Sequence, residues 1–295
     1  MSQADFGLML QPQPLNFPAH DLFDYNRRLI QALPPGFTTL WAEDHLQWGE
    51  EATIECFTTL AYFAAEFPRY HVGSLVLCQA YRNPALLAKM AANLQAMSGG
   101  RCILGIGAGW KEEEYRAYGY TFPNPRERVE QLEEAAAIIK AMWTSSPATS
   151  VGKHFRVENA YCEPRPDLPI PLLIGAGGEQ RALRVVARYA DWYNFNSCTV
   201  EQYAHKVAVL KEHCRAIGRD PATIKLTYLG TVSVSDDPAR VYRTPDKHIV
   251  AGSAAEVIRE LEQFCALGVS HFILRFRDRE TLEYFGEKVA QHFTK

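Results

Sequence analysis

An acid and a histidine stand next to each other where an apolar run of the sequence ends. Asp44 and His45 close the run that begins at Thr38, and Trp48 follows three residues later. A carboxylate beside a histidine can orient the ring for proton transfer, and a tryptophan can form the wall for a flat ligand. A capping aspartate and a histidine at the rim of the fold would leave the same pattern.

A glycine-rich segment follows a later apolar run. Gly105, Gly107 and Gly109 alternate with other residues up to Trp110, which lets a ligand approach the backbone closely or marks a tight bend. The segment does not fit a dinucleotide fingerprint. No glycine or alanine stands three residues after Gly109, and the acidic run Glu112–Glu114 would face the pyrophosphate.

A second glycine-rich segment, Gly175–Glu179, leads directly into a helical pattern that begins near Leu183. Unpaired amides and the helix dipole favour an anion at such a turn, and Arg181 could add positive charge. The segment therefore predicts a phosphate site, with a plain strand-to-helix turn as the alternative. No metal site is predicted, because Gln11–Gln13 lacks the His-x-His that a barrel metallohydrolase would carry there.

Eight short apolar runs that alternate with helical stretches must position these residues. The runs are continuous, as in a parallel sheet that helices cover on its outer face. The predicted strands are Asp5–Gln11, Thr38–Asp44, His71–Cys78, Arg101–Ala108, Pro171–Gly175, Asp191–Asn196, Lys225–Val234 and Ser270–Phe276. Helix starts are expected at the caps Asn83, Asn124, Thr199 and Ser253.

Eight β-α units predict an α/β fold, a (β/α)8 TIM barrel, with a doubly wound open sheet as the runner-up. The turn-rich stretch 145–170 is an expected insertion between the fourth helix and the fifth strand, with a short hairpin around His154–Val157. No linker divides the chain, so we expect residues 1–295 to form one domain.

The composition narrows the range of partners. The 295 residues carry 31 Lys and Arg against 34 Asp and Glu, a net charge of −3, without a basic cluster. Nucleic acid and acidic membrane surfaces are therefore not expected as partners. Seven widely spaced cysteines form no Cys-x-x-Cys pair, and no signal peptide or membrane span is evident, so we expect a cytoplasmic protein without disulfides.

Several of these motifs together resemble one family. Arg82–Lys89, Ser98–Trp110 with Glu114, Pro171–Gly178 and Ala187–Trp192 resemble the bacterial luciferase-like superfamily of flavin and deazaflavin oxidoreductases. Within it, the chain is most similar to the branch of probable oxidoreductases that use coenzyme F-420 (F420). The resemblance covers nearly the whole chain and implies a barrel with a cofactor across its mouth, often in a homodimer.

The resemblance also implies roles for particular residues. The cofactor ring would lie against Leu75-Val76, where family members often have a non-proline cis peptide, and the phosphate on the backbone of Gly177–Glu179. Asp44 and His45 match the acid-histidine pair beside the reactive carbon in deazaflavin sugar-phosphate dehydrogenases. Trp110 stands where those enzymes have a glutamate that donates a proton, and Ala108 where bacterial luciferase has a phosphate-binding arginine.

We therefore expect an oxidoreductase that transfers hydride between F420 and a small organic substrate. An FMN-dependent luciferase-like monooxygenase, a non-catalytic flavin-binding protein and a metal-dependent hydrolase are the alternatives. His45, oriented by Asp44, is expected to transfer the proton, and Gln11, Trp48 and Tyr115 to line the substrate pocket. The expected cofactor-binding residues are Leu75, Val76, Gly107, Ala108, Gly109, Trp110, Gly175, Ala176, Gly177, Gly178, Glu179 and Arg181.

Overall fold

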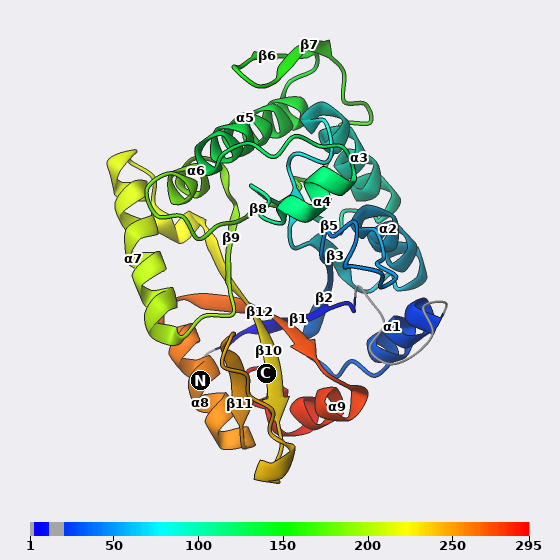
Figure 1. Ribbon diagram of the computed structural model, residues 1–295, viewed down its shortest axis with the longest axis vertical. Coiled ribbons are helices and arrows are strands. Elements are labelled where there is room, and N and C mark those ends of the chain that lie inside the picture. Colours follow the sequence, from blue (N-terminus) through cyan, green and yellow to red (C-terminus); the bar gives the residue numbers. More distant parts are fainter. Residues whose placement is uncertain (1–2, 12–20, 295) are drawn as a thin grey trace.

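Eight parallel strands close into a barrel in the computed structural model, which describes residues 3–11 and 21–294 (Figure 1). The hydrogen-bonded order is β1-β2-β3-β5-β8-β9-β10-β12, and β12 pairs again with β1. The strands are β1 (Asp5–Met9), β2 (Phe37–Ala42), β3 (His71–Ser74), β5 (Cys102–Gly107), β8 (Leu172–Gly175), β9 (Trp192–Asn196), β10 (Lys225–Val234) and β12 (Val269–Phe276). The predicted TIM barrel is confirmed, and its closure excludes the open sheet.

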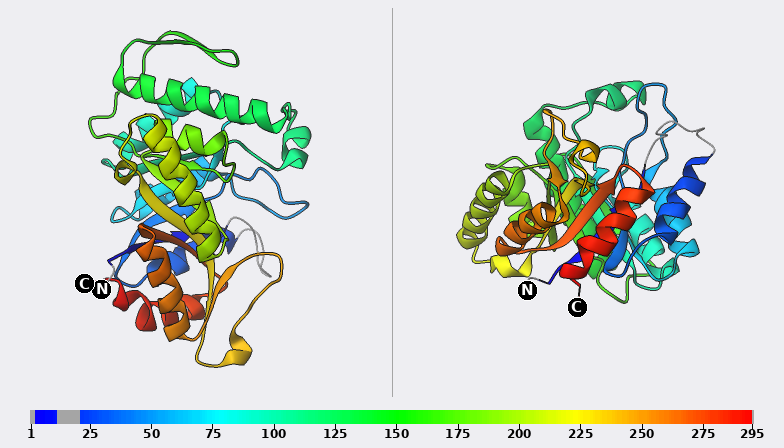
Figure 2. Two further views of the ribbon diagram at one scale, coloured as in Figure 1. Left: turned by 90° about the vertical axis from the view of Figure 1, so that its left-hand side faces the viewer. Right: turned by 90° about the horizontal axis from the view of Figure 1, so that it is seen from below.

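Helices surround the strands (Figure 2). They are α1 (Leu22–Gln31), α2 (Cys56–Glu66), α3 (Pro84–Met97), α4 (Glu112–Ala117), α5 (Pro125–Thr144), α6 (Ala182–Tyr189), α7 (Val200–Ala216), α8 (Ala254–Ala266) and α9 (Arg279–Lys288). Two short strands extend the sheet, since β4 (Leu77–Cys78) pairs with β5 and β11 (Ile249–Gly252) pairs with β10. The six-residue α4 and the strand β11 were not expected from the sequence.

The caps expected from the sequence begin four of these helices. The Asn83 side chain accepts a hydrogen bond from the Ala85 N–H at 2.9 Å, and Asn124 accepts one from the Glu127 N–H at 3.0 Å. Thr199 forms a capping box at α7, and Ser253 donates to the Glu256 carboxylate at α8. These contacts satisfy amide groups that the first helical turn leaves free.

The insertion between α5 and β8 carries the expected hairpin, made of β6 (Ala148–Val151) and β7 (Arg156–Ala160). Figure 1 shows the hairpin beyond α5 at the edge of the molecule. The Glu134 carboxylate of α5 accepts hydrogen bonds from the backbone N–H groups of Lys153, His154 and Phe155 at 2.8–2.9 Å. One helical side chain thus holds the turn of the hairpin against the barrel.

A histidine and an aspartate lie inside the barrel near the N-terminal ends of its strands. His271 is fully buried, and its Nδ1–H donates to the Asp5 carboxylate at 2.8 Å. The Thr39 hydroxyl accepts from the Trp41 indole N–H at 2.6 Å and donates to His271 Nε2 at 3.0 Å. We call Asp5 and His271 the floor pair. Both ring nitrogens of His271 have partners when the ring is neutral.

The seven cysteines are free thiols. None of the helices in the described part of the chain is long and apolar enough to cross a membrane. Pro12 and Gln13, which entered the argument against a metal site, lie outside the described residues.

Candidate active site

A cavity of about 500 Å³ opens where the barrel strands end. Residues after β2, β5, β8 and β9 line it together with the β3–β4 connection and the start of α5, as expected for the C-terminal face of a barrel. Many of the site residues expected from the sequence line this one cavity: Asp44, His45, Leu75, Val76, Gly107, Ala108, Gly109, Trp110, Gly175, Ala176, Gly177 and Gly178.

The three residues expected in the substrate pocket do not line the cavity. Gln11 is buried in the barrel wall, where its side-chain amide donates to the Phe276 carbonyl at 2.9 Å. Tyr115 is also buried, and its hydroxyl lies 2.9 Å from Cys78 Sγ, behind the cavity wall. Trp48 is 37% exposed and lies beside the His45 ring.

Two residues expected to bind the cofactor also lie outside the cavity lining. The Glu179 carboxylate binds Lys206 Nζ at 2.5 Å and His205 Nε2 at 3.1 Å, both from α7. Arg181 is exposed at the N-terminus of α6. The positive charge expected from Arg181 is therefore not aimed at the cavity.

His45 is held by a buried carboxylate, and that carboxylate is Glu114 of α4. The His45 Nδ1–H lies 3.1 and 3.2 Å from the two Glu114 oxygens, and Glu114 is only 1% exposed. We call His45 and Glu114 the mouth pair. No residue in the described ranges binds His45 Nε2. This nitrogen is therefore free to exchange a proton with a molecule in the cavity.

Glu114 is fixed by further donors. It accepts hydrogen bonds from the backbone N–H groups of Leu46 at 3.1 Å and Gln47 at 3.3 Å, and from the Tyr81 hydroxyl at 3.2 Å. Burial, together with the nearby Cys78 and Glu114, raises the pKa of Tyr81, which keeps this hydroxyl protonated as a donor. The carboxylate is satisfied without water and holds both the ring and the backbone that carries it.

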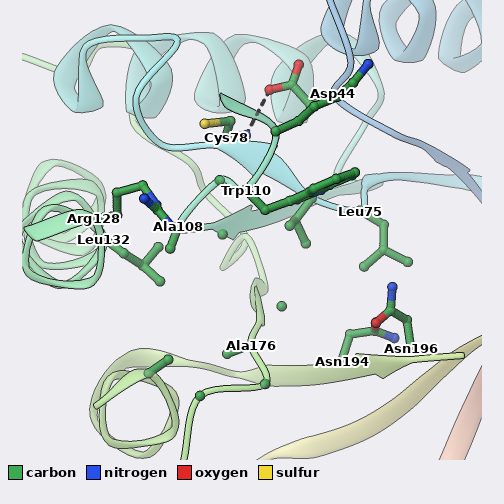
Figure 3. Close-up of a pocket in the computed structure, with 18 of the residues that line it drawn as sticks. Asp44, Leu75, Cys78, Ala108, Trp110, Arg128, Leu132, Ala176, Asn194 and Asn196 are labelled. Carbon is green, nitrogen blue, oxygen red and sulfur yellow. Dashed lines mark hydrogen bonds between the residues drawn. The ribbon is translucent and has the colours of Figure 1, made fainter. Parts of the chain in front are cut away.

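The expected contact between Asp44 and His45 is wrong. The Asp44 carboxylate accepts hydrogen bonds from both terminal guanidinium nitrogens of Arg82 at 2.9 Å. It also accepts one from the Cys78 N–H at 2.8 Å (Figure 3). Consecutive side chains of an extended segment point in opposite directions, so Asp44 turns toward α3 while His45 turns toward α4. Asp44 fixes the chain between β4 and α3, and Glu114 orients the histidine.

Two glycines of the barrel make room for the Val76 side chain in one wall of the cavity. A Cβ atom on Gly107 would lie 2.6 Å from Val76 Cγ2, and one on Gly175 would lie 3.0 Å from Val76 Cγ1. Any larger residue at Gly107 would collide with Val76. The Leu75-Val76 peptide bond is cis, as the resemblance implied, and it interrupts the strand between β3 and β4.

The opposite end of the cavity can hold an anion. Within the described chain, the backbone N–H groups of Gly177 and Gly178, which line the cavity, have no acceptor, and they precede the start of α6. Arg128 and Leu132 reach into the cavity from α5, across from Leu75 (Figure 3). Arg128 Nε is buried and has no hydrogen-bond partner among the described residues.

The sequence did not reveal the roles of Glu114 and Arg128. Glu114 was visible as part of the family pattern, but the acidic run around it indicated only repulsion of phosphate. Glu114 and Tyr115 are the buried residues of α4, but the six residues of this helix are too few to show a pattern from which that burial could be predicted. Arg128 lies in the first turns of α5, far along the chain from the glycine turn, and only the closure of the barrel brings them to one cavity.

Residues 3–11 and 21–294 contain no group of three or more His, Cys, Asp or Glu side chains that could hold a metal ion.

Residues 4–280 match the model of the luciferase-like monooxygenase family. The chain is 33% identical over 217 residues to an F420-dependent glucose-6-phosphate dehydrogenase of Kineococcus radiotolerans. This alignment covers 72% of this chain and 64% of that protein. The chain is 32% identical over 229 residues to an F420-dependent hydroxymycolic acid dehydrogenase of Mycobacterium tuberculosis, covering 75% and 62%. The alignments thus span less than two thirds of either relative.

Solved structures share the fold. An F420-dependent secondary alcohol dehydrogenase in complex with an F420-acetone adduct superposes with a TM-score of 0.84, covering 99% of this chain and all of that one at 19% identity. An F420-dependent tetrahydromethanopterin reductase from Methanopyrus kandleri gives a TM-score of 0.79 at 18% identity, covering 99% and 100%. At these identities the likeness shows the architecture alone.

Proposed function

Because the chain belongs to the luciferase-like monooxygenase family, we propose that it is an oxidoreductase that uses F420 and transfers hydride to or from a small organic substrate. The observation that carries the proposal is the mouth pair, which places an unpartnered imidazole nitrogen on a glycine-walled cavity. The names of the relatives support F420 as the cofactor.

The residues of the cavity fit a molecule with a flat ring and an anionic tail. Gly107 and Gly175 lie against the Val76 side chain, and these three residues form a cavity wall without long side chains. The free N–H groups of Gly177 and Gly178, with the unpartnered Arg128 Nε, suit a phosphate. When bound there, F420 would supply the carbon that accepts or gives the hydride.

The protein's own part is to move a proton at His45 Nε2. When an alcohol is oxidised, its carbon loses a hydride and its hydroxyl proton passes to Nε2, which leaves a carbonyl product. The imidazolium formed at His45 is stabilised by the Glu114 carboxylate on Nδ1. In the reverse direction, Nε2 donates the proton to the oxygen of the carbonyl. The geometry serves both directions.

The cofactor is tested by titrating the purified protein with F420 and with FMN side by side. We expect F420 fluorescence to change with saturable binding, and Arg128→Ala to weaken this binding about tenfold or more, since it removes a charged donor. The matched control is Arg188→Ala, because Arg188 lies on α6 and pairs with Glu133 at the surface. Tight retention of FMN without any response to F420 would overturn F420 as the cofactor. Bound F420 that no alcohol or ketone can reduce or oxidise would favour the non-catalytic alternative.

A further inference from the structure

Two tryptophans surround the histidine of the mouth pair. The Trp48 ring meets His45 edge-on with centroids 5.0 Å apart, and the Trp110 ring does so at 5.9 Å. Trp110 lines the cavity and is 67% exposed. We call Trp48 and Trp110 the aromatic rim. Large apolar side chains left in contact with solvent at a cavity edge are typical of a ligand site.

The charges near the aromatic rim do not suit an anion. Glu43, which precedes Asp44 and His45 in the chain, lines the cavity and is ion-paired with Arg275 at 2.6 Å. Among the described residues that line the cavity, Lys111 and Arg128 are the lysine and arginine side chains. Lys111 Nζ is already bound to the Gln47 carbonyl at 2.9 Å and lies 4.0 Å from the Trp48 ring centre.

Arg128 reaches the cavity from α5, and Figure 3 shows it on the other side of Trp110 from Leu75. Arg128 belongs to the anion-binding part of the cavity, so a phosphate group on the substrate would find Lys111, which is already bound to the Gln47 carbonyl, as the cation near His45. A flat apolar group would meet the Trp110 ring instead. Aromatic pairs stabilise such contacts beyond the area that they bury. An uncharged group also avoids the desolvation of a phosphate that has no partner.

We propose that the substrate is an uncharged alcohol or ketone with a flat, apolar group, which packs on the aromatic rim while its oxygen faces His45 Nε2. This inference rests on the proposed function and deepens it. It predicts a preference for an aromatic secondary alcohol over a sugar phosphate, although sugar-phosphate dehydrogenases are among the relatives by name.

Binding is measured first, by calorimetric titration of the protein without cofactor, using acetophenone and glucose 6-phosphate as probes. We expect saturable binding of acetophenone, at least tenfold weaker in Trp110→Ala and largely restored in Trp110→Phe. Tyr161→Ala is the matched control, because Tyr161 is also 67% exposed but does not line the cavity. Tighter binding of glucose 6-phosphate than of acetophenone, or equal binding of acetophenone by Trp110→Ala, would overturn the inference.

Turnover with F420 is measured second, with 1-phenylethanol and glucose 6-phosphate as substrates. We expect 1-phenylethanol to have a kcat/KM at least tenfold higher, and Trp110→Ala to remove this preference mainly through KM. A preference for glucose 6-phosphate would overturn the substrate class and leave the F420 assignment intact. Failure of F420 to bind would overturn the proposed function, whereas the acetophenone titration would still decide the role of the aromatic rim.

Discussion

The two ends of the barrel each hold a histidine against a carboxylate, and the two pairs differ in what lies at the second ring nitrogen. In the floor pair, the Asp5 carboxylate accepts a hydrogen bond from the Nδ1–H of His271, and the Thr39 hydroxyl donates one to Nε2. In the mouth pair, Glu114 takes the Nδ1–H of His45, and Nε2 has no partner within the described chain. The same two functional groups can therefore stabilise a fold or move a proton, depending on whether the second nitrogen is sealed.

The surroundings reinforce the difference. The His271 ring lies between Trp41 and Trp192, with centroids 5.9 and 5.6 Å away, and no part of it reaches solvent. Burial lowers the pKa of His271, although Asp5 opposes the shift, so the ring stays neutral. The mouth pair lies on an open cavity instead. Each of the following changes tests whether the floor pair serves stability and the mouth pair serves proton transfer.

The largest effect is expected when His45 is replaced. His45→Ala should lower turnover with F420 by about 100- to 10,000-fold, because it removes the group that exchanges the substrate's proton. Its free energy of unfolding should fall by only about 1 kcal/mol, because the buried Glu114 carboxylate loses one donor but keeps those of Leu46, Gln47 and Tyr81. Steady-state kinetics and urea unfolding measure the two quantities. His292→Ala is the control, because His292 pairs with Glu262 and neither residue lines the cavity. Turnover of His45→Ala within threefold of wild type would refute the role of His45 in proton transfer.

Replacement of His271 should have the opposite profile. His271→Leu leaves the Asp5 carboxylate and the Thr39 hydroxyl without their partner, so the free energy of unfolding should fall by about 2–4 kcal/mol. Turnover of the folded protein should stay within about threefold of wild type. Urea unfolding followed by circular dichroism measures the loss, with His292→Ala expected to lose under about 1 kcal/mol. A loss of turnover greater than the loss of folded protein would break the comparison.

A smaller effect is expected from Glu114→Gln. The variant keeps the size of the side chain but removes the charge that stabilises the His45 imidazolium, and turnover should fall by about 10- to 100-fold. The fall should appear in kcat while KM changes little, because the Glu114 carboxylate binds Nδ1 of His45 and not Nε2, the nitrogen that exchanges the proton. Nitrogen NMR of labelled histidine should show the Nδ1–H form of His45 in wild type and a mixture of forms in the variant. Unchanged NMR spectra and kcat would assign Glu114 a purely structural role.

The barrel could be predicted from the sequence because each of its strands is a continuous apolar run bounded by turns, and helix caps follow at the right places. The His71–Cys78 run shows what such patterns cannot predict. It reads as one strand, but the chain forms β3 and β4 around the Leu75-Val76 bond, and no hydrophobic pattern distinguishes that break. The acidic run that contains α4 has too little apolar periodicity to predict a helix.

The site was predicted in its residue types more than in its pairings. Asp44 and His45 are neighbours in the chain, and the sequence could not show that their side chains leave an extended segment on opposite sides. Glu114 lies 69 residues from His45 and Arg128 lies far from the glycine turn at Gly177. The closure of the barrel brings such residues together, and no local pattern in the sequence predicts which residues will meet.

Acidification is the mildest way to test the floor pair. An unfolded chain protonates His271 at its ordinary pKa of 6.5, whereas burial lowers that pKa in the folded protein. Between pH 7 and pH 5 the unfolded state therefore binds more protons, and the free energy of unfolding falls as the pH falls. If His271 stays neutral down to pH 5, this single group lowers the free energy of unfolding by at most about 2 kcal/mol.

Asp5 does not interfere in that interval. Burial alone would raise the pKa of Asp5, but the contact with His271 and the charge of Lys225 outweigh it and lower the pKa to about 2. The stability that Asp5 contributes is therefore complete above its unfolded pKa of 3.8 and is lost only as the pH falls toward 2.

Urea unfolding at pH 7, 6 and 5 should show wild type losing stability faster than His271→Gln, whose side chain does not titrate. The pKa of His71 is also lowered, but His71 is present in both proteins, so its effect on the difference largely cancels. Parallel pH dependences in the two proteins would mean that His271 accepts its proton in the folded state, and that the second ring nitrogen of the floor pair is not sealed.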